Sequence, residues 1–260
     1  MTLIDFHTHV YPAKIAEKAT QATCSFYDLH TQLVGTTDVL LQKGKEAGIS
    51  RFVLLPVAVK PEQTRHINEF TVSEVQAHPE FYGFGTLHAA TENPLEEIDW
   101  IIDAGLKGVK MHPDIQNFPI DDPRLFPVYD RMQGVLPVIL HTGDPRHDNS
   151  HPRRMRRVMD MFPRLQVIAA HLGGWSVFDD AIEYLRDTSC FVDLCSCFQL
   201  LPPERMTDYI RRYGAERVLF GTDFPLWEPA EEVKAFERLS LRDDERELIA
   251  YRNALRILEA

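Results

Sequence analysis

The sequence predicts an α/β fold in which eight parallel strands close into a (β/α)8 (TIM) barrel. Apolar strand-like segments alternate with helical segments at intervals of roughly 25–35 residues, as βαβ units require. The strand segments are apolar almost throughout, which is typical of a sheet covered on both faces. The 260 residues suit one such barrel. A doubly wound open sheet is the alternative, but no glycine-rich dinucleotide-binding turn follows the first strand.

The strands are expected at residues 3–10, 51–57, 81–87, 106–112, 136–141, 165–171, 190–194 and 218–221. Helices are expected at residues 14–22, 37–47, 65–77, 93–105, 121–133, 152–161, 176–186, 203–213, 228–239 and 243–258. Residues 24–35 lack clean periodicity and are expected to form an elaborated loop after the first strand, which could act as a lid. We find no linker or domain boundary, so residues 1–260 are predicted to form a single domain.

Helix-end signals support several of these boundaries. Thr36 or Thr37 can cap the helix that Gly48 ends. Asn93 is expected to cap the helix that opens with Pro94 at its first position.

Composition excludes several classes of partner. The net charge of −11 argues against nucleic acid and anionic membranes, since both favour a basic surface. No apolar run is long enough for a secretory signal or a membrane span, so a cytoplasmic location is expected. The four cysteines, Cys24, Cys190, Cys195 and Cys197, are expected to be reduced core thiols. A soft-metal site at Cys195 and Cys197 is the weaker alternative.

Polar residues follow the carboxyl ends of five predicted strands. His7 and His9 end the first strand, where side chains two residues apart face the same way. The other strand ends carry Lys110, His112, His141, His171 and Asp223. In a barrel these ends converge on one mouth, where the loops build the active site. Imidazole and carboxylate together suit Zn²⁺, with Mn²⁺ or Fe²⁺ as alternatives.

An ordered set of motifs carries a family resemblance: Asp5-Phe-His7-Thr-His9, Gly108-Val-Lys-Met-His-Pro113, Ile139-Leu-His-Thr-Gly143, Ala170-His-Leu-Gly-Gly174 and Phe220-Gly-Thr-Asp-Phe-Pro225. With these motifs the chain resembles the amidohydrolase superfamily, most closely its amidohydrolase-related branch. That branch includes aminocarboxymuconate semialdehyde decarboxylase and related decarboxylases, hydratases and lactone hydrolases. The TatD-like nucleases also begin with two such histidines, but they carry a glutamate where this chain has Lys110.

The resemblance implies one divalent metal ion, with Zn²⁺ expected and Mn²⁺ possible, held by His7, His9, His141 and Asp223. His171 would lie beside a metal-bound water and share proton transfer with Asp223. In binuclear relatives the lysine of the fourth strand is carboxylated and bridges two metals. We expect a single metal instead, with Lys110 or His112 contacting an anionic substrate.

Two further residues are candidates for substrate contact. Arg146 could bind a substrate carboxylate through two parallel hydrogen bonds, or it could be an ordinary surface arginine. Trp227, together with Phe224, could form a wall for a planar substrate, or could simply pack. The arginine-rich run at residues 153–157 is more typical of a solvated helix face than of a phosphate site.

These observations predict a metal-dependent hydrolase that acts on a small carboxylated ester, lactone or amide through metal-activated water. The first alternative is a non-oxidative decarboxylase or hydratase, a lyase, that uses the same metal site. A binding protein that kept the barrel but lost catalysis is less consistent with the complete set of site residues. The expected partner is a small-molecule substrate, and the resemblance suggests a homo-oligomer.

Overall fold

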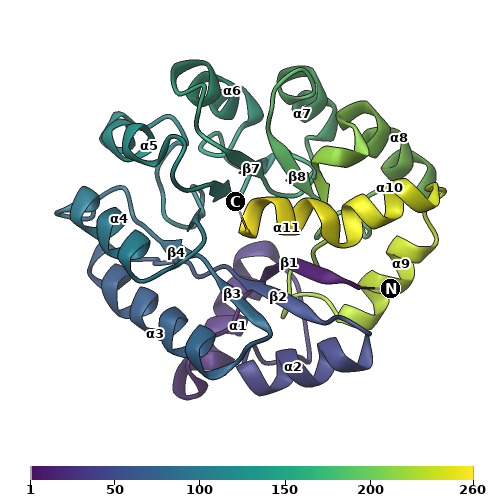
Figure 1. Cartoon of the computed structure of the whole chain (residues 1–260), viewed down its shortest axis with the longest axis horizontal. Coiled ribbons are helices and arrows are strands. Elements are labelled where there is room, and N and C mark those ends of the chain that lie inside the picture. Colours follow the sequence, from purple (N-terminus) through teal and green to yellow (C-terminus); the bar gives the residue numbers. More distant parts are fainter. Residues whose placement is uncertain (1, 260) are drawn as a thin grey trace.

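Parallel strands surrounded by helices form the centre of the molecule (Figure 1). The computed structural model describes residues 2–259. Its strands, each parallel to the next in its sheet, are β1 (Ile4–Thr8), β2 (Arg51–Leu54), β3 (Phe81–Gly83), β4 (Gly85–Thr86), β5 (Val109–Met111), β6 (Val138–Leu140), β7 (Val167–Ala169), β8 (Phe191–Asp193) and β9 (Val218–Leu219).

Backbone hydrogen bonds at two seams join the two sheets into a closed barrel. Strands β3 and β4 are one strand interrupted at Phe84. On one side Phe84 N–H donates to Leu54 O (3.0 Å), and on the other Gly85 N–H donates to Gly108 O (2.8 Å). At the second seam, Phe6 N–H donates to Phe220 O and Asp223 N–H donates to His7 O, each at 2.9 Å. The predicted eight-stranded (β/α)8 barrel is therefore confirmed.

The helices form a ring around the strands and cover one end of the barrel. They are α1 (Ala13–Tyr27), α2 (Thr37–Glu46), α3 (Thr64–Ala77), α4 (Pro94–Asp103), α5 (Phe126–Met132), α6 (Pro152–Met161), α7 (Phe178–Leu185), α8 (Pro203–Tyr213), α9 (Pro229–Glu237), α10 (Asp243–Glu247) and α11 (Asn253–Leu258). In Figure 1, α11 crosses the centre of the barrel. There Ile257 and Leu258 belong to the same buried hydrophobic cluster as Ile4 and Phe6, which closes the amino end and leaves the carboxyl end for the site.

Helix α1 differs from its predicted extent. It continues five residues beyond the predicted end at residue 22 and includes Tyr27, so only residues 28–36 form the loop. Its buried positions, Ala16, Thr20 and Cys24, recur every four residues, and the third extends the same buried stripe into the segment we had assigned to the loop.

The capping predictions had mixed outcomes. Thr36 caps α2, because its Oγ1 accepts a hydrogen bond from Val39 N–H at 3.3 Å. Helix α4 opens at Pro94 as predicted, but the side chain of Asn93 accepts no capping hydrogen bond.

A β-bulge in β1 sets the direction of the two first histidines. Asp5 lies opposite Phe52, but Thr8 lies opposite Leu54, so β1 contains one residue more than β2 over this stretch. Phe6 points into the barrel interior, and strict alternation would therefore turn His7 outward. The extra residue brings His7 and His9 to the inside together, which is a common effect of bulges beside active sites.

No helix between residues 2 and 259 has the combination of length and apolar character that crossing a membrane requires. The four cysteines are free and buried, as predicted for core thiols.

Glu232 on α9 is a buried acid away from the strand ends. Its side chain accepts a hydrogen bond from Gln199 Nε2 at 2.5 Å, and its second carboxylate oxygen has no hydrogen-bond partner among residues 2–259. Burial raises the pKa of Glu232 to about 8. The unfolded chain loses this proton at lower pH than the folded chain does, so folding stability falls as the pH rises toward 8.

We therefore predict that Glu232→Gln flattens the dependence of stability on pH between 5 and 8. The free energy of unfolding of the wild type should fall by up to about 1.4 kcal/mol for each pH unit through this group. Urea unfolding of the metal-free protein at several pH values measures the effect. Glu231→Gln, at an exposed position of the same helix, is the matched control, and parallel curves for wild type and Glu232→Gln would contradict the prediction.

Candidate metal centre

The predicted strand-end residues meet at the inner end of one cavity. This cavity has a volume of about 1100 Å³ and opens at the carboxyl side of the barrel. Its inner surface carries all seven residues predicted there: His7, His9, Lys110, His112, His141, His171 and Asp223. The barrel mouth thus brings together side chains from β1, β5, β6, β7 and the segment after β9.

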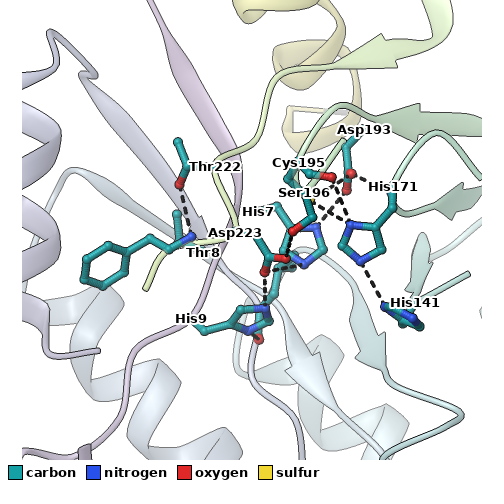
Figure 2. Close-up of polar contacts among 12 residues, drawn as sticks. His7, Thr8, His9, His141, His171, Asp193, Cys195, Ser196, Thr222 and Asp223 are labelled. Carbon is teal, nitrogen blue, oxygen red and sulfur yellow. Dashed lines mark hydrogen bonds and ion pairs between the residues drawn. The ribbon is translucent and has the colours of Figure 1, made fainter. Parts of the chain in front are cut away.

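Two imidazoles and one carboxylate present metal-binding atoms to one another. His7 Nδ1 lies 2.8 Å from Asp193 Oδ2 (Figure 2). His9 Nδ1 lies 2.6 Å from Leu55 O. Because these oxygens are acceptors, each Nδ1 carries the proton and each Nε2 keeps a free lone pair. Asp223 Oδ1 lies 3.2 Å from His9 Nε2 and 3.7 Å from His7 Nε2.

A short chain of hydrogen bonds fixes the Asp223 carboxylate. Ser196 Oγ donates to Asp223 Oδ2 at 2.5 Å, and Trp227 Nε1 donates to Ser196 Oγ at 2.8 Å. Asp223 adopts a left-handed backbone conformation (φ 59°), which a non-glycine residue keeps only where its surroundings impose it. Trp227 lines the cavity and, through Ser196, also positions Asp223, whereas Phe224 is buried outside the described cavity lining. A role for Trp227 as a wall for a planar substrate stays a prediction.

His171 belongs to a second, overlapping group of donor atoms. Its backbone N–H donates to Asp193 Oδ1 at 2.8 Å, and its Nδ1 lies 3.2 Å from the sulfur of Cys195. The thiol of Cys195 donates to Asp193 Oδ1 at 3.0 Å. One possible ligand atom from each of His7, His171, Cys195 and Asp223 lies within 4.8 Å of the others.

The donor atoms are thus grouped differently from the predicted ligand set. His7 and Asp223 belong to both sets, and His9 contacts Asp223 directly. His141 instead places Nδ1 2.9 Å from His171 Nε2, and its ring stacks on His112 with centroids 4.0 Å apart. The ligand role of His141 stays a prediction.

Burial favours the neutral form of three imidazoles, those of His7, His112 and His141, and neutral imidazole is the form that binds metals. Burial and the nearby Lys110 lower the pKa of His7 to about 4. Burial, together with Lys110 and the neighbouring imidazoles, lowers the pKa of His112 and of His141 well below the usual value. Burial alone would raise the pKa of Asp223, but His7 and its neighbours hold it well below its usual range, so the carboxylate stays ionised.

These residues fit a divalent metal ion. Neutral imidazole nitrogens and an ionised carboxylate converge, and the remaining nitrogens of His7 and His9 are held by a carboxylate and a carbonyl. That outer layer of acceptors is typical of histidines that bind metals, because it fixes the tautomer and the ring orientation. Nitrogen and oxygen donors suit Zn²⁺ and Mn²⁺, and the adjacent thiol of Cys195 adds a donor that favours Zn²⁺.

Lys110 and His112 lie beside this group. Lys110 Nζ is 3.2 Å from His7 Nε2, and burial lowers the pKa of its amine. Within residues 2–259, Lys110 is the one lysine or arginine that lines the cavity, and no carboxylate lies within 4 Å of its amine. His112 Nδ1 accepts from Ile115 N–H, so its Nε2 carries the proton and donates to Tyr27 Oη at 2.5 Å.

Arg146 does not occupy the predicted position. Its Nε and Nη2 form a pair of parallel hydrogen bonds with the carboxylate of Asp144 (3.0 and 2.7 Å). Arg146 does not line the cavity. Its Nη1 donates to Phe26 O at 2.8 Å. Arg146 thus ties the end of α1 to the loop after β6, and its carboxylate-binding edge is already used.

Sequence reasoning missed three residues of this site. Asp193 ends β8 and obeys the same strand-end rule that identified the histidines, so a usable signal was present. Ser196 had no signal, because only the turn after β8 brings it to Asp223. Tyr27 was missed because we expected its helix to end five residues earlier.

The family model described as Amidohydrolase matches residues 4–260. The chain therefore belongs to the amidohydrolase family and is an enzyme of the amidohydrolase superfamily, whose members depend on metal ions.

Solved structures share this fold. An uncharacterised TIM-barrel protein from Bordetella bronchiseptica is 23% identical, with a TM-score of 0.82 over 100% of this chain and 99% of that one. A dihydroxybenzoic acid decarboxylase from a Polaromonas species, with bound manganese and 2-nitroresorcinol, is 18% identical and has a TM-score of 0.78. The match covers 99% of this chain and 97% of that chain. A candidate 2-pyrone-4,6-dicarboxylic acid hydrolase from Pseudomonas putida is also 18% identical and has a TM-score of 0.71. This match covers 99% of this chain and 97% of that chain.

We predict that Asp193→Asn weakens metal binding by about 10–100-fold. An amide nitrogen facing His7 Nδ1 would favour the other tautomer and place a proton on Nε2, where the lone pair is needed. Competition with a chelating dye for Zn²⁺ measures the affinity, and circular dichroism checks the fold. Asp187→Asn, at an exposed site, is the control. Unchanged Zn²⁺ affinity in Asp193→Asn would contradict the proposed role of Asp193.

Proposed function

We propose that this enzyme removes CO₂, without oxidation, from a small planar carboxylic acid. The observation that carries this proposal is the position of the positive charge. Lys110, the one lysine or arginine lining the described cavity, lies against His7 at the candidate metal centre. A substrate carboxylate would therefore be drawn to that centre, which makes the carboxylate itself the reacting group.

Hydrolysis of a carboxylated ester, our prediction from the sequence, requires a different distribution of charge. The carbonyl to be attacked would occupy the metal centre, and the carboxylate would need a second cation farther out. Arg146 was one candidate for this contact, but its guanidinium is engaged by Asp144. The structural evidence therefore favours the lyase alternative for an anionic substrate.

The proposed reaction is balanced by one proton. A divalent ion, when bound, would supply a Lewis acid that orients the substrate and stabilises its developing negative charge. Lys110 would hold the carboxylate, the carbon–carbon bond would break with its electron pair left on the substrate carbon, and CO₂ would leave. Tyr27 would then donate the hydroxyl proton to that carbon and recover it from water.

Tyr27 suits proton donation because of its partner. Since His112 Nε2 donates to the Tyr27 oxygen, the hydroxyl hydrogen remains free to point into the cavity. Burial raises the pKa of Tyr27 well above its usual value, so the hydroxyl is protonated at neutral pH and is a weaker acid than a free phenol. The hydrogen bond from His112 would offset this by stabilising the phenolate that remains after proton transfer.

Hydrolysis of a neutral ester or lactone is the second candidate, because an uncharged substrate needs no second cation. In that reaction His171 and Asp223, which belong to the group of possible metal-binding residues, would take the proton from an activated water.

Product analysis tests the proposal. Protein loaded with Zn²⁺ or Mn²⁺ is incubated with 2,6-dihydroxybenzoate, 5-carboxyvanillate and 2-pyrone-4,6-dicarboxylate, and products are followed by NMR and by CO₂ release. We expect CO₂ from an aromatic acid, and loss of activity after chelation or in His7→Ala. Ring opening of the pyrone without CO₂ release would favour hydrolysis. Activity that survives both metal removal and His7→Ala would exclude metal dependence.

Tyr27→Phe should lower the decarboxylation rate by about 10²–10⁴-fold, the usual range for loss of a proton donor. The substrate KM should change little, because the carboxylate contact remains. Tyr11→Phe, which also removes a hydroxyl from the cavity wall, is the matched control and should keep most of its activity. Equal rate losses in the two variants would contradict a specific role for Tyr27.

A further inference from the structure

The cavity is larger than the proposed reaction needs. Its volume of about 1100 Å³ lies just above the range of roughly 300–1,000 Å³ that is typical of pockets for drug-sized ligands. The metal-binding and proton-donating side chains occupy only its inner end. The remaining space, which we call the outer chamber, lies between α1, α3 and the segment after β2.

Helix α1 presents an apolar stripe to this chamber. Ile15, Ala19, Ala22 and Phe26 recur at spacings of four, three and four residues, so they share one face of the helix. All four line the cavity. A different face of α1 carries its buried positions, including Ala16 and Thr20. The helix therefore has two apolar faces, and only one of them packs against the protein.

The wall formed by α3 and the segment after β2 is mixed, with polar side chains such as Gln63 and His66 beside an apolar group. Val57 and Val59 follow β2, and Ile67 and Phe70 face the cavity from α3. Ile15 and Val59, one on each wall, are 52% and 51% exposed. Large apolar side chains left in water on two facing walls indicate a surface that another apolar group covers.

The charges at the chamber limit what that group can be. The outer rim includes Glu62 and Glu69, whereas the cation Lys110 lies at the inner end. A phosphate-bearing carrier would meet carboxylates at the rim, where the described lining has no lysine or arginine beside them, because Lys110 lies at the inner end. A protein partner is a poor fit as well. Protein interfaces commonly bury about 800 Å² of open surface on each partner, whereas the chamber is a concave extension of one cavity.

We infer that the outer chamber binds an uncharged apolar extension of the substrate, such as an alkyl chain or a second ring. The inference rests on the proposed function, because the same molecule would place its carboxylate at Lys110 and its apolar end between α1 and α3. The substrate class is then a carboxylic acid with a planar head and an apolar tail. A bare ring acid would fill the inner end only.

Binding of a graded ligand series tests this inference. Calorimetry of the metal-loaded full chain with benzoate and with 4-methyl-, 4-butyl- and 4-hexylbenzoate measures the affinity as the tail grows. Each added methylene should tighten binding about fourfold, as expected for burial of a CH₂ group. An affinity that does not depend on tail length overturns the outer chamber as a tail site.

Two wall variants locate the tail. Ala22→Leu narrows the chamber with a residue that favours helix, and it should weaken 4-hexylbenzoate at least tenfold while leaving benzoate within twofold. Val59→Ser on the facing wall should also weaken only the long ligands. Gln21→Leu is the matched control, because Gln21 is an exposed neighbour on α1 that does not line the cavity. Equal effects on short and long ligands, or an effect of Gln21→Leu alone, overturn the assignment.

The same titrations separate this inference from the proposed function. Benzoate binding that requires the metal, combined with no gain from the tail, overturns the chamber and leaves the metal-centred site intact. Tail-dependent binding that is indifferent to metal removal overturns the placement of the carboxylate, and with it the proposed function. Self-association that 4-hexylbenzoate reverses in light scattering would assign the chamber to a second copy of the chain and overturn the inference.

Discussion

The buried carboxylate of Asp193 organises the candidate metal centre. One of its oxygens faces His7 Nδ1 at 2.8 Å, and the other accepts from the backbone N–H of His171 and from the thiol of Cys195. Burial alone would raise the pKa of Asp193, but His7 and its other neighbours hold it at about 2. The residue is therefore ionised across the physiological range. It fixes the tautomer of one metal-binding candidate and the left-handed backbone of another (φ 60° at His171).

The barrel geometry explains why so few residues suffice to build this site. Asp5 accepts from the backbone N–H and the hydroxyl of Thr222 (2.9 and 2.6 Å) and from His7 N–H (3.1 Å). This buried carboxylate joins β1 to the segment that carries Asp223. Asp5 and Asp193 together hold the donors from two sides, while the bulge in β1 turns His7 and His9 toward them. The catalytic chemistry then depends on the placement of each side chain at a strand end.

The fold and the core of the site were predictable because both follow from regular rules. Strand–helix alternation predicted the barrel, and the carboxyl ends of parallel strands predicted that His7, Lys110, His171 and Asp223 would meet. The rest depends on contacts that these two rules do not cover. The hydrogen bond of Tyr27 to His112 joins residues far apart in sequence, and its helix is longer than its polar composition indicates. Arg146 has a charged neighbour, Asp144, only two residues away, and that local pairing took precedence over a role toward substrate.

The closing seam of the barrel gives the metal centre a consequence for folding. His7 and His9 come from the first strand, and Asp223 follows the last, so their contacts join positions separated by almost the whole sequence. Bringing such distant segments together has a large entropic cost for an unfolded chain. An ion bound across this seam would act as a reversible cross-link between the first strand of the barrel and the segment after its last strand. The supply of metal in the cell would then govern how long the barrel stays closed, in addition to whether the enzyme is active.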